Sequence, residues 1–220
     1  MHNGNLQKIR NGVRTYGITP HIPGGFVGAD TLERIAKVSR KYKGVIKITS
    51  GQRILITNLK EEDLPLIWEE LGMEPAVVTA NSVKNVEICP AAFCKRSKYN
   101  TTPMGLKLSK KYSHMEMPCR TKIGVAGCLN ACGGVYGRDV GVIADKPGIM
   151  IVAGGSTGYN PRIADIIAKE LDEPSAMLLI DSIFDYYREV AELGEKLSFL
   201  IERIGIDTFK AEVLKRANLI

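Results

Sequence analysis

Three short apolar-rich runs in the first part of the chain predict strands, and the first of them alternates loosely between apolar and polar positions, with the two-residue period of a strand. The runs are residues 13–19, 45–49 and 53–57. Ser50-Gly51-Gln52 separates the last two runs and predicts a tight turn between them. A fourth run, residues 76–79, is a candidate closing strand.

Two longer segments repeat their apolar residues every three or four positions, which predicts amphipathic helices. Asp30 is the predicted N-cap of the first helix. Its inward residues are expected to be Leu32, Ile35, Ala36 and Val38. The second helix covers residues 61–71, and its inward residues are expected to be Leu64, Leu66, Ile67 and Leu71. The order strand–helix–strand–strand–helix–strand is that of the ferredoxin-like split βαβ unit, which we place at residues 1–80.

The second part of the chain mixes predicted strands and helices. Strands are expected at residues 120–126, 140–144 and 149–153. One helix is predicted to start near Pro103 and run toward His114, and another to run from Pro161 to Leu171. Between the last strand and Pro161, the sequence Gly-Gly-Ser-Thr-Gly at 154–158 predicts a loop that can approach a ligand closely.

The C-terminal tail, residues 174–215, is predicted to be helical. Its periodic apolar residues are interpreted as core: Leu178, Ile180, Ile183, Phe184, Tyr187, Val190, Leu197, Leu200, Ile201 and Ile204. The chain is therefore predicted to be an α+β protein, with a ferredoxin-like unit followed by a mixed α/β domain at residues 81–220 that ends in this tail.

Composition places the chain among ordinary globular proteins and leaves room for a sizeable core. It has 220 residues, of which 45% are hydrophobic and 25% are charged. No apolar run approaches the length of a membrane span, and Met1-His2-Asn3-Gly4 lacks the apolar core of a signal peptide. Five cysteines without an export signal favour a reducing cytoplasm and metal binding over disulfides.

Four of the five cysteines form two close pairs. Cys89 and Cys94 form a C-x4-C pair, and Cys128 and Cys132 form a C-x3-C pair. Four thiolates in two pairs suit a [4Fe–4S] cluster. A zinc site is the alternative, since four thiolates also bind zinc, but the second pair follows an apolar strand in a large domain rather than a small loop-rich module. Cys119 has no partner at ligand spacing and is interpreted as a small residue near the site.

The formal charge of +6 is concentrated between the two cysteine pairs. The basic residues of this block are Lys95, Arg96, Lys98, Lys107, Lys110, Lys111, Arg120 and Lys122, against the single acid Glu116. A solvated face or a nucleic-acid surface would have the same composition, but the neighbouring thiols favour an anionic cofactor or substrate. Arg120 and Lys122 are two apart on a predicted strand, so both face the same side and suit an oxyanion.

Several segments are similar to one known family. Residues 14–25 are similar to the opening strand and loop of its ferredoxin-like repeat, and residues 47–53 to its cofactor-contacting turn. Residues 125–132, Val-Ala-Gly-Cys-Leu-Asn-Ala-Cys, are similar to its second cysteine motif, and 139–143 and 152–155 to the strands behind it. Together with the helical tail, these segments resemble the sirohaem-dependent nitrite/sulfite reductase family in its single-copy form.

This resemblance implies a [4Fe–4S] cluster and a sirohaem. The implied cluster ligands are Cys89, Cys94, Cys128 and Cys132, and Cys132 would also join the cluster to the sirohaem iron. The residues implied or expected to contact the sirohaem are Gln52, Lys95 and Asn130. Sirohaem carries many carboxylates, which gives the basic block a physical reason. The spacing of the first pair is shorter than the family's usual one, so that loop is expected to be tighter, and Leu129 replaces a small residue or proline.

The resemblance also implies which residues face the substrate. Arg120 and Lys122 match basic strand residues that face the substrate in this family. His21 stands where an arginine is common, and Gly51 stands where sulfite reductases have a second arginine. Arg53 is the candidate replacement, and His21 is a candidate proton donor; from its local sequence alone, His21 also fits an ordinary surface histidine.

The predicted function is six-electron reduction of sulfite to sulfide in the cytoplasm. Nitrite reduction to ammonia, a non-catalytic iron–sulfur electron carrier and a zinc- or cluster-stabilised nucleic-acid binder are the alternatives. No G-x-G-x-x-G fingerprint follows a strand, so an external ferredoxin or flavoprotein is expected to deliver electrons. Because many relatives contain two fused copies of this unit, we expect a homodimer, with no nucleic-acid or membrane partner.

Overall fold

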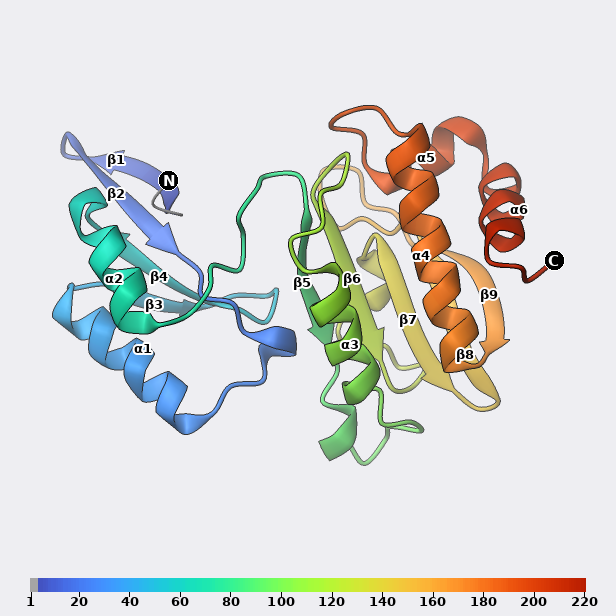
Figure 1. The fold of residues 1–220 in the computed structure, drawn as a ribbon, viewed down its shortest axis with the longest axis horizontal. Helices are drawn as coiled ribbons and strands as arrows, with labels where there is room; N and C mark the ends of the chain where they lie inside the picture. The colour runs from blue at the N-terminus through green and yellow to red at the C-terminus, as the bar shows by residue number, and fades with distance from the viewer. Residues whose placement is uncertain (1–3) are drawn as a thin grey trace. The chain divides into compact units, whose positions relative to one another are not determined.

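The computed structural model describes residues 4–220 (Figure 1). The chain divides into two compact units, Met1–Val78 and Thr79–Ile220. The division expected from the sequence lies after residue 80. The first three residues, on which the expectation of no export signal partly rests, lie outside the described residues. No helix within residues 4–220 combines the length and the apolar character needed to cross a membrane.

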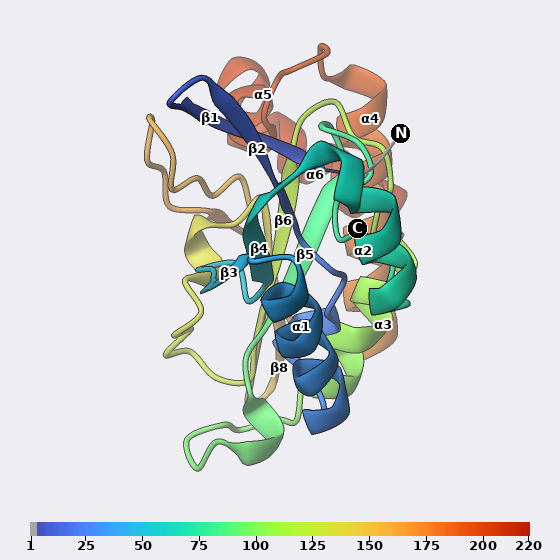
Figure 2. The same cartoon turned by 90° about the vertical axis from the view of Figure 1, so that its left-hand side faces the viewer.

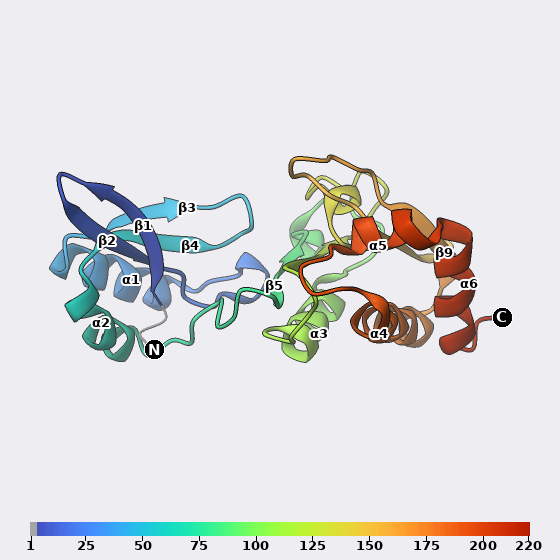
Figure 3. The ribbon, with the colours of Figure 1, turned by 90° about the horizontal axis from the view of Figure 1, so that it is seen from above.

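The first unit is a four-stranded antiparallel sheet with two helices on one face, as Figure 3 shows. The strand order is β1-β2-β4-β3. The strands are β1 (Asn5–Arg10), β2 (Val13–Ile18), β3 (Val45–Ile48) and β4 (Ile54–Leu59). The helices are α1 (Ala29–Lys41) and α2 (Leu64–Leu71).

The helices of the first unit bury a narrower face than the sequence predicts. Ile35 and Val38 of α1 are buried, but Leu32 is 43% exposed, and Ala36 is exposed as well. In α2 the predicted inward residue Leu66 is 53% exposed. Each short helix contacts the sheet through a single stripe, so apolar residues at its border stay in solvent. The N-cap of α1 is Gly28 rather than Asp30.

The predicted closing strand at 76–79 is wrong, because these residues form no strand. Pro20 and Pro75 form only an isolated bridge, since proline has no N–H to continue a ladder. The edge of β2 pairs instead with β1, which the apolar pattern did not predict. Leu6 and Ile9 of β1 are 70% and 56% exposed, so this edge strand lacks the alternation of a half-buried one.

The second unit is a mixed sheet of order β5-β6-β7-β8-β9. Its strands are β5 (Val83–Ile88), β6 (Thr121–Ala126), β7 (Val140–Asp145), β8 (Gly148–Ala153) and β9 (Asp165–Leu171). The pairs β5–β6 and β6–β7 are parallel, and the other two pairs are antiparallel. The predicted α+β class is therefore confirmed, with the three predicted strands of this half close to their expected positions.

The second unit has four α-helices among the described residues. They are α3 (Thr102–Tyr112), α4 (Glu173–Val190), α5 (Leu197–Ile204) and α6 (Ile206–Arg216). Two of them, α3 and α4, cover one face of the sheet. In Figures 2 and 3, α3 and α4 lie on one side of the sheet, and the loop between β8 and β9 lies on the other. The predicted core of the tail is confirmed for Ile180, Ile183, Phe184, Tyr187, Leu197, Leu200 and Ile201, whereas Leu178 is 53% exposed.

The predicted helix from Pro161 to Leu171 is wrong. Residues 165–171 form β9, an edge strand that pairs antiparallel with β8 through Ile151↔Ala168 and Ile149↔Leu171. A short apolar run does not distinguish a strand from a helix by period alone, and the pairing with β8 decides the outcome here.

Candidate functional site

Both cysteine pairs follow neighbouring parallel strands. β5 ends at Ile88, directly before Cys89, and β6 ends at Ala126, two residues before Cys128. Because the two strands are parallel, their carboxyl ends lie at the same edge of the sheet (Figure 1). We call this region the cysteine edge. It contains Cys89, Cys94, Cys128 and Cys132.

Backbone hydrogen bonds hold the two cysteine loops together. The Cys89 N–H donates to the Val125 carbonyl at 2.8 Å. The Gly127 carbonyl accepts three bonds from the first loop: from the Lys98 N–H at 2.8 Å, from Ser97 Oγ at 3.1 Å and from the Tyr99 N–H at 3.3 Å. The loop carrying one cysteine pair is thus tied to the residue that precedes the other pair.

Gly127 is the point of closest approach between these loops. A Cβ atom at this position would overlap Ser97 Oγ and would lie 2.6 Å from the Tyr99 carbonyl oxygen. Only glycine leaves enough space for the loops to meet here. The glycine before Cys128 therefore has a structural reason.

The four thiols act on one another electrostatically. Burial raises the pKa of the Cys89 thiol, a backbone hydrogen bond lowers it, and the thiols of the other three cysteines raise it further. All five cysteines of the chain are free of disulfides. The structure thus brings all four predicted ligands to one edge, and Cys119 is the one cysteine that does not contribute to this shift.

The cysteine edge fits the donor set of an iron–sulfur cluster. Among the described residues, no three His, Cys, Asp or Glu side chains are placed to hold a single metal ion. Four sulfurs around one zinc would each lie about 2.3 Å from it, whereas a [4Fe–4S] cluster has one thiolate on each of its irons and separates its ligands more widely. Cys132 is exposed, and its Sγ accepts a hydrogen bond from Asn130 Nδ2 at 3.1 Å.

A nearly buried ion pair supports the second cysteine loop. Arg138 donates to Glu87 Oε2 through Nε at 2.8 Å and Nη2 at 2.5 Å, and both side chains are largely buried. Glu87 belongs to β5, while Arg138 Nη2 also reaches the Gly133 carbonyl at 3.4 Å. The pair therefore joins the strand before Cys89 to the loop after Cys132. Sequence reasoning missed it, because neither residue carries a local signal.

A small polar pocket lies beside the start of β6, at the end of the strand opposite the cysteine edge. Its volume is about 200 Å³. We call it the anion pocket, and it is lined by Arg120, Lys122, Gly137, Asp139, Gly155, Ser156, Thr157, Gly158 and Lys196. It unites the predicted basic pair with the predicted glycine-rich loop. Lys196 comes from the tail and was not predicted.

Asp139 lies in the wall of this pocket and is only 7% exposed. Its Oδ2 accepts a hydrogen bond from the Lys122 N–H at 2.8 Å, which fastens the start of β6 to the residue before β7. Burial raises the pKa of Asp139 to about 6, although the Lys122 N–H and the charge of Lys196 act to lower it.

We expect the Asp139→Asn variant to lose a pH dependence of stability. The folded pKa of about 6 exceeds the ordinary value of 3.8, so the folded state binds more protons between these values. The free energy of unfolding of the wild type then falls as pH rises across this window, by on the order of 3 kcal/mol, and is level above it. Asparagine keeps an acceptor for the Lys122 N–H. Urea unfolding at several pH values measures the slope, and an unchanged slope in the variant would contradict this cause.

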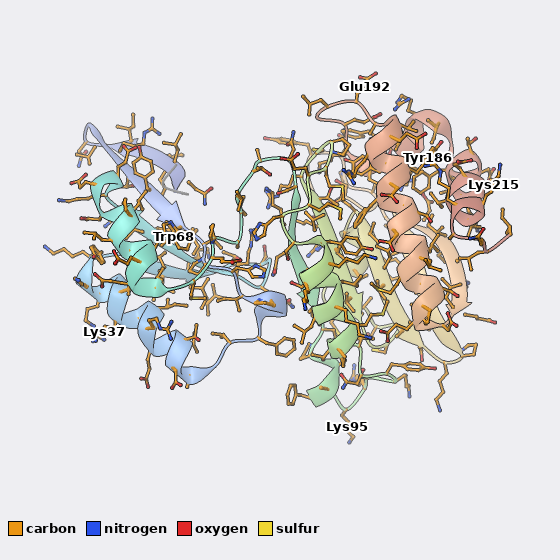
Figure 4. All side chains as sticks on the ribbon, in the orientation of Figure 1. Lys37, Trp68, Lys95, Tyr186, Glu192 and Lys215 are labelled. Atoms are coloured by element: carbon orange, nitrogen blue, oxygen red, sulfur yellow. The ribbon has the colours of Figure 1, made fainter. Side chains whose placement is uncertain are left out.

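Two lysines of the basic block between the cysteine pairs form ion pairs with acidic residues and do not face the anion pocket. Lys107 of α3 forms an ion pair with Glu173 at 2.5 Å, and Lys111 forms one with Asp181 at 2.6 Å, so both lysines join α3 to α4 or its start. Lys95 is exposed in the first cysteine loop, as Figure 4 shows. The block is therefore not one continuous surface for an anionic cofactor.

The remaining predicted residues belong to the first unit. His21 is half-buried, and its backbone N–H donates to the backbone carbonyl of Glu74 at 2.7 Å. Gln52 and Arg53 lie in and after the turn between β3 and β4. A Cβ atom on Gly25, whose φ is +76°, would lie 2.9 Å from Gln52 Cβ, so the loop after β2 packs against this turn. The structure thus brings together, within this unit, the segments that carry His21, Gln52 and Arg53.

The first unit also has a larger hollow, of about 570 Å³. Its lining is Leu6, Gln7, Lys8, Val13, Thr15, Thr57 and Asn58. It contains one charged residue and none of the predicted site residues, so the smaller anion pocket is better suited to bind a small anion.

Comparison with known proteins gives two family matches that together span most of the chain. Residues 7–74 match the nitrite/sulfite reductase ferredoxin-like half domain. Residues 79–219 match the nitrite and sulphite reductase 4Fe-4S domain. The first match confirms the ferredoxin-like character predicted for the N-terminal unit.

Curated relatives include reductases of both anions. The assimilatory-type sulfite reductase of Nitratidesulfovibrio vulgaris is 34% identical over 91% of this chain and 93% of its own length. The nitrite reductase [NAD(P)H] of Bacillus subtilis is 30% identical over 87% of this chain, but over only 24% of its own length. This chain thus spans nearly all of the first protein and about a quarter of the second.

Solved structures share the fold at low sequence identity. The Mycobacterium tuberculosis NirA protein superposes with a TM-score of 0.80 at 17% identity, over 94% of this chain and 41% of that chain. Dissimilatory sulfite reductase I superposes with a TM-score of 0.76 at 14% identity, over 93% and 69%.

Proposed function

This chain belongs to the nitrite and sulphite reductase family, and we propose that it reduces sulfite to sulfide with six electrons from an external donor. The observation that carries the proposal is the cysteine edge, where two distant thiol pairs meet on neighbouring strands. Family members are oxidoreductases, so a purely structural or nucleic-acid-binding role is not favoured.

Sulfite is preferred over nitrite because the sulfite reductase relative shares the higher sequence identity with this chain, 34% against 30% for the Bacillus subtilis nitrite reductase. Nitrite reduction to ammonia is the second candidate, because its reductases share about the same identity with the chain.

The residues of the cysteine edge would hold the redox groups. Cys89, Cys94, Cys128 and Cys132 would hold a [4Fe–4S] cluster, and Cys132, which is exposed, would also serve as the link to the sirohaem. When bound, the two groups supply electrons one at a time and an iron that accepts the substrate. Asn130 donates to the Cys132 sulfur and so lowers its negative charge. Lys95 would provide a basic contact to the carboxylates of the macrocycle, and Gln52 stays a candidate polar contact from the family resemblance alone.

The anion pocket would handle the substrate. Arg120 and Lys122 attract the oxyanion and hydrogen-bond its oxygens, and Lys122 can deliver a proton as oxygen leaves as water. His21 and Arg53 stay candidate substrate-binding residues from the family resemblance alone. The positive charges of Arg120 and Lys122 would offset the negative charge of the bound anion.

We also propose a homodimer, in which a second copy related by a twofold axis restores the arrangement of relatives with two fused copies and closes part of the substrate cavity. We place this dimer in the cytoplasm, where thiols stay reduced and a ferredoxin or flavoprotein can supply electrons. Light scattering measures the molar mass and tests the dimer.

We expect the Arg120→Ala/Lys122→Ala double variant to reduce turnover by roughly 10²–10³-fold, the range for losing one pre-organised donor. Its visible spectrum should stay close to wild type, because neither residue lies at the cysteine edge. Turnover of sulfite and of nitrite with reduced viologen is the measurement, and it also decides between the two substrates.

Lys107→Ala is the matched control, since it removes one basic residue of the same block and leaves the anion pocket intact. Its turnover should equal that of the wild type. An unchanged rate in the double variant would remove the role of Arg120 and Lys122.

A further inference from the structure

The anion pocket contains a basic residue that neither the sequence pattern nor the resemblance assigns. We infer that Lys196 is the third cation of this pocket and sets its affinity for a small oxyanion or a carboxylate group. The inference rests on the proposed function only in taking Arg120 and Lys122 as the anion-binding pair.

The position of the Lys196 ammonium group supports this role. A Cβ atom on Gly158 would lie 3.7 Å from Lys196 Nζ and 3.9 Å from Ser156 Oγ. The ammonium group therefore reaches the glycine-rich loop that forms the pocket wall opposite β6. Within residues 4–220, no carboxylate forms an ion pair with Lys196 or with Arg120. Arg120 and Lys196 thus face the pocket without an ion pair to a carboxylate of the described residues, and the acid on which the charge of Lys196 acts is the buried Asp139.

The segment that carries Lys196 is fastened to the start of β6. The Gly194 N–H donates to the Pro118 carbonyl at 2.8 Å, two residues before Arg120. The Tyr187 hydroxyl donates to the Glu195 carbonyl at 2.6 Å. These bonds fix the backbone of the 191–196 segment relative to the basic pair.

Glu195, the acidic residue next to Lys196 in the sequence, binds a different cation. The carboxylate of Glu195 accepts two hydrogen bonds from Arg203, each at 2.8 Å, so it is occupied by another cation. Figure 4 labels Glu192 in the same connection after α4. Asp139 is the one acidic residue among the lining residues, and its Oδ2 already accepts the Lys122 N–H. Three cations against one buried carboxyl leave a pocket that attracts negative charge.

The pocket also has the size and donors for a small anion. About 200 Å³ accommodates an ion such as sulfite, nitrite or sulfate, but not a macrocycle. Ser156 and Thr157 add hydroxyl donors beside the charges. A carboxylate at the edge of a larger cofactor has the same chemistry as a free oxyanion, so the test must separate the two sources.

The test uses the holoenzyme and compares Lys196→Ala with Lys196→Arg. Substitution should leave the fold intact, because only the backbone carbonyl of Lys196 takes part in α5, through a 3.0 Å bond from the Leu200 N–H. Sulfate, which is redox-inert, serves as the probe in calorimetric titrations at low ionic strength. We expect Lys196→Ala to bind sulfate about tenfold more weakly, as for the loss of one charge-assisted hydrogen bond, and Lys196→Arg to restore most of the affinity.

Steady-state kinetics and cofactor content identify the source of the anion. If the pocket binds the free substrate, Lys196→Ala raises KM for sulfite far more than it lowers kcat, and the sirohaem content is unchanged. If the pocket binds a cofactor carboxylate, sirohaem content falls in Lys196→Ala and recovers in Lys196→Arg. Lys215→Ala, on α6 and outside the pocket, controls for net charge and should match the wild type.

Failure of this inference is distinct from failure of the proposed function. If the wild type reduces neither anion but its sulfate affinity depends on Lys196, the reductase proposal fails and the pocket assignment stands. If the wild type reduces sulfite, and Lys196→Ala changes neither sulfate affinity, nor KM, nor sirohaem content, the assignment of Lys196 is overturned.

Discussion

Replacing Cys128 with serine is expected to abolish the iron–sulfur cluster and, with it, sulfite turnover. Thiolates are the ligands of such clusters, and a serine hydroxyl stays protonated and binds iron weakly. The iron that Cys128 would bind then lacks its thiolate ligand, so the four-iron cluster should not persist. Non-haem iron and acid-labile sulfide should fall from roughly four per chain toward zero, and the visible absorption should lose its cluster shoulder.

Cys119→Ser is the matched control for this loss. Cys119 precedes β6, whereas the cysteine edge follows it, and the thiol of Cys119 does not contribute to the shifted pKa of Cys89. The variant should keep both iron and colour. Loss of the cluster in Cys119→Ser, or its retention in Cys128→Ser, would show that the ligand assignment is wrong. A colourless wild type with one zinc would establish the zinc alternative instead.

Gly127→Ala is expected to separate the two cysteine loops. The added methyl group would overlap Ser97 Oγ and lie 2.6 Å from the backbone oxygen of Tyr99. The side chain of Ser97 can rotate away, but the backbone of Tyr99 cannot, so the loop carrying Cys94 must move. Overpacking of this kind lowers the free energy of unfolding by about 1–3 kcal/mol, and the displaced ligands should also lower cluster content. Urea unfolding and iron analysis measure the two effects.

Gly133→Ala lies in the same region and tests whether the effect is steric. No heavy atom lies within 4 Å of a Cβ placed on Gly133, so this variant should keep wild-type stability and iron. A second comparison adds Ser97→Ala to Gly127→Ala, which should recover only part of the loss because the contact with Tyr99 remains. Full recovery, or equal damage in Gly133→Ala, would argue against the proposed contact.

Apolar runs predicted the positions of β2, β3, β4, β6, β7 and β8 and of the helices of the tail within a few residues. They did not predict burial equally well, because every residue of β3 is exposed, whereas β6 and β7 are buried almost throughout. β1, β5 and β9 were missed, and each is an edge strand of its sheet whose pairing depends on a neighbour rather than on alternation. The cysteine spacing was informative because thiols are rare and their chemistry is specific.

Contacts between residues that are far apart in the sequence could not be predicted from local sequence patterns. Lys196 joins Arg120 and Lys122 because a connection after α4 is fastened to Pro118, which no motif indicates. Glu87 and Arg138 form their ion pair across two strands and a loop. Conversely, Lys107 and Lys111 belong to a conspicuous basic block, yet they bind acids on α4 or its start. Charge along the sequence therefore overestimates the surface that is available to an anionic cofactor.

The parallel pairing of β5 and β6 has a consequence for maturation in the cell. Parallel neighbours need a crossover, here through α3, before Cys89 and Cys128 can meet. A nascent or misfolded chain offers an assembly factor at most one pair of thiols at a time. A complete set of four thiols then exists only after this crossover docks, so full cofactor loading should report correct folding. Overproduction that outpaces folding should accordingly yield apoprotein even when iron is plentiful.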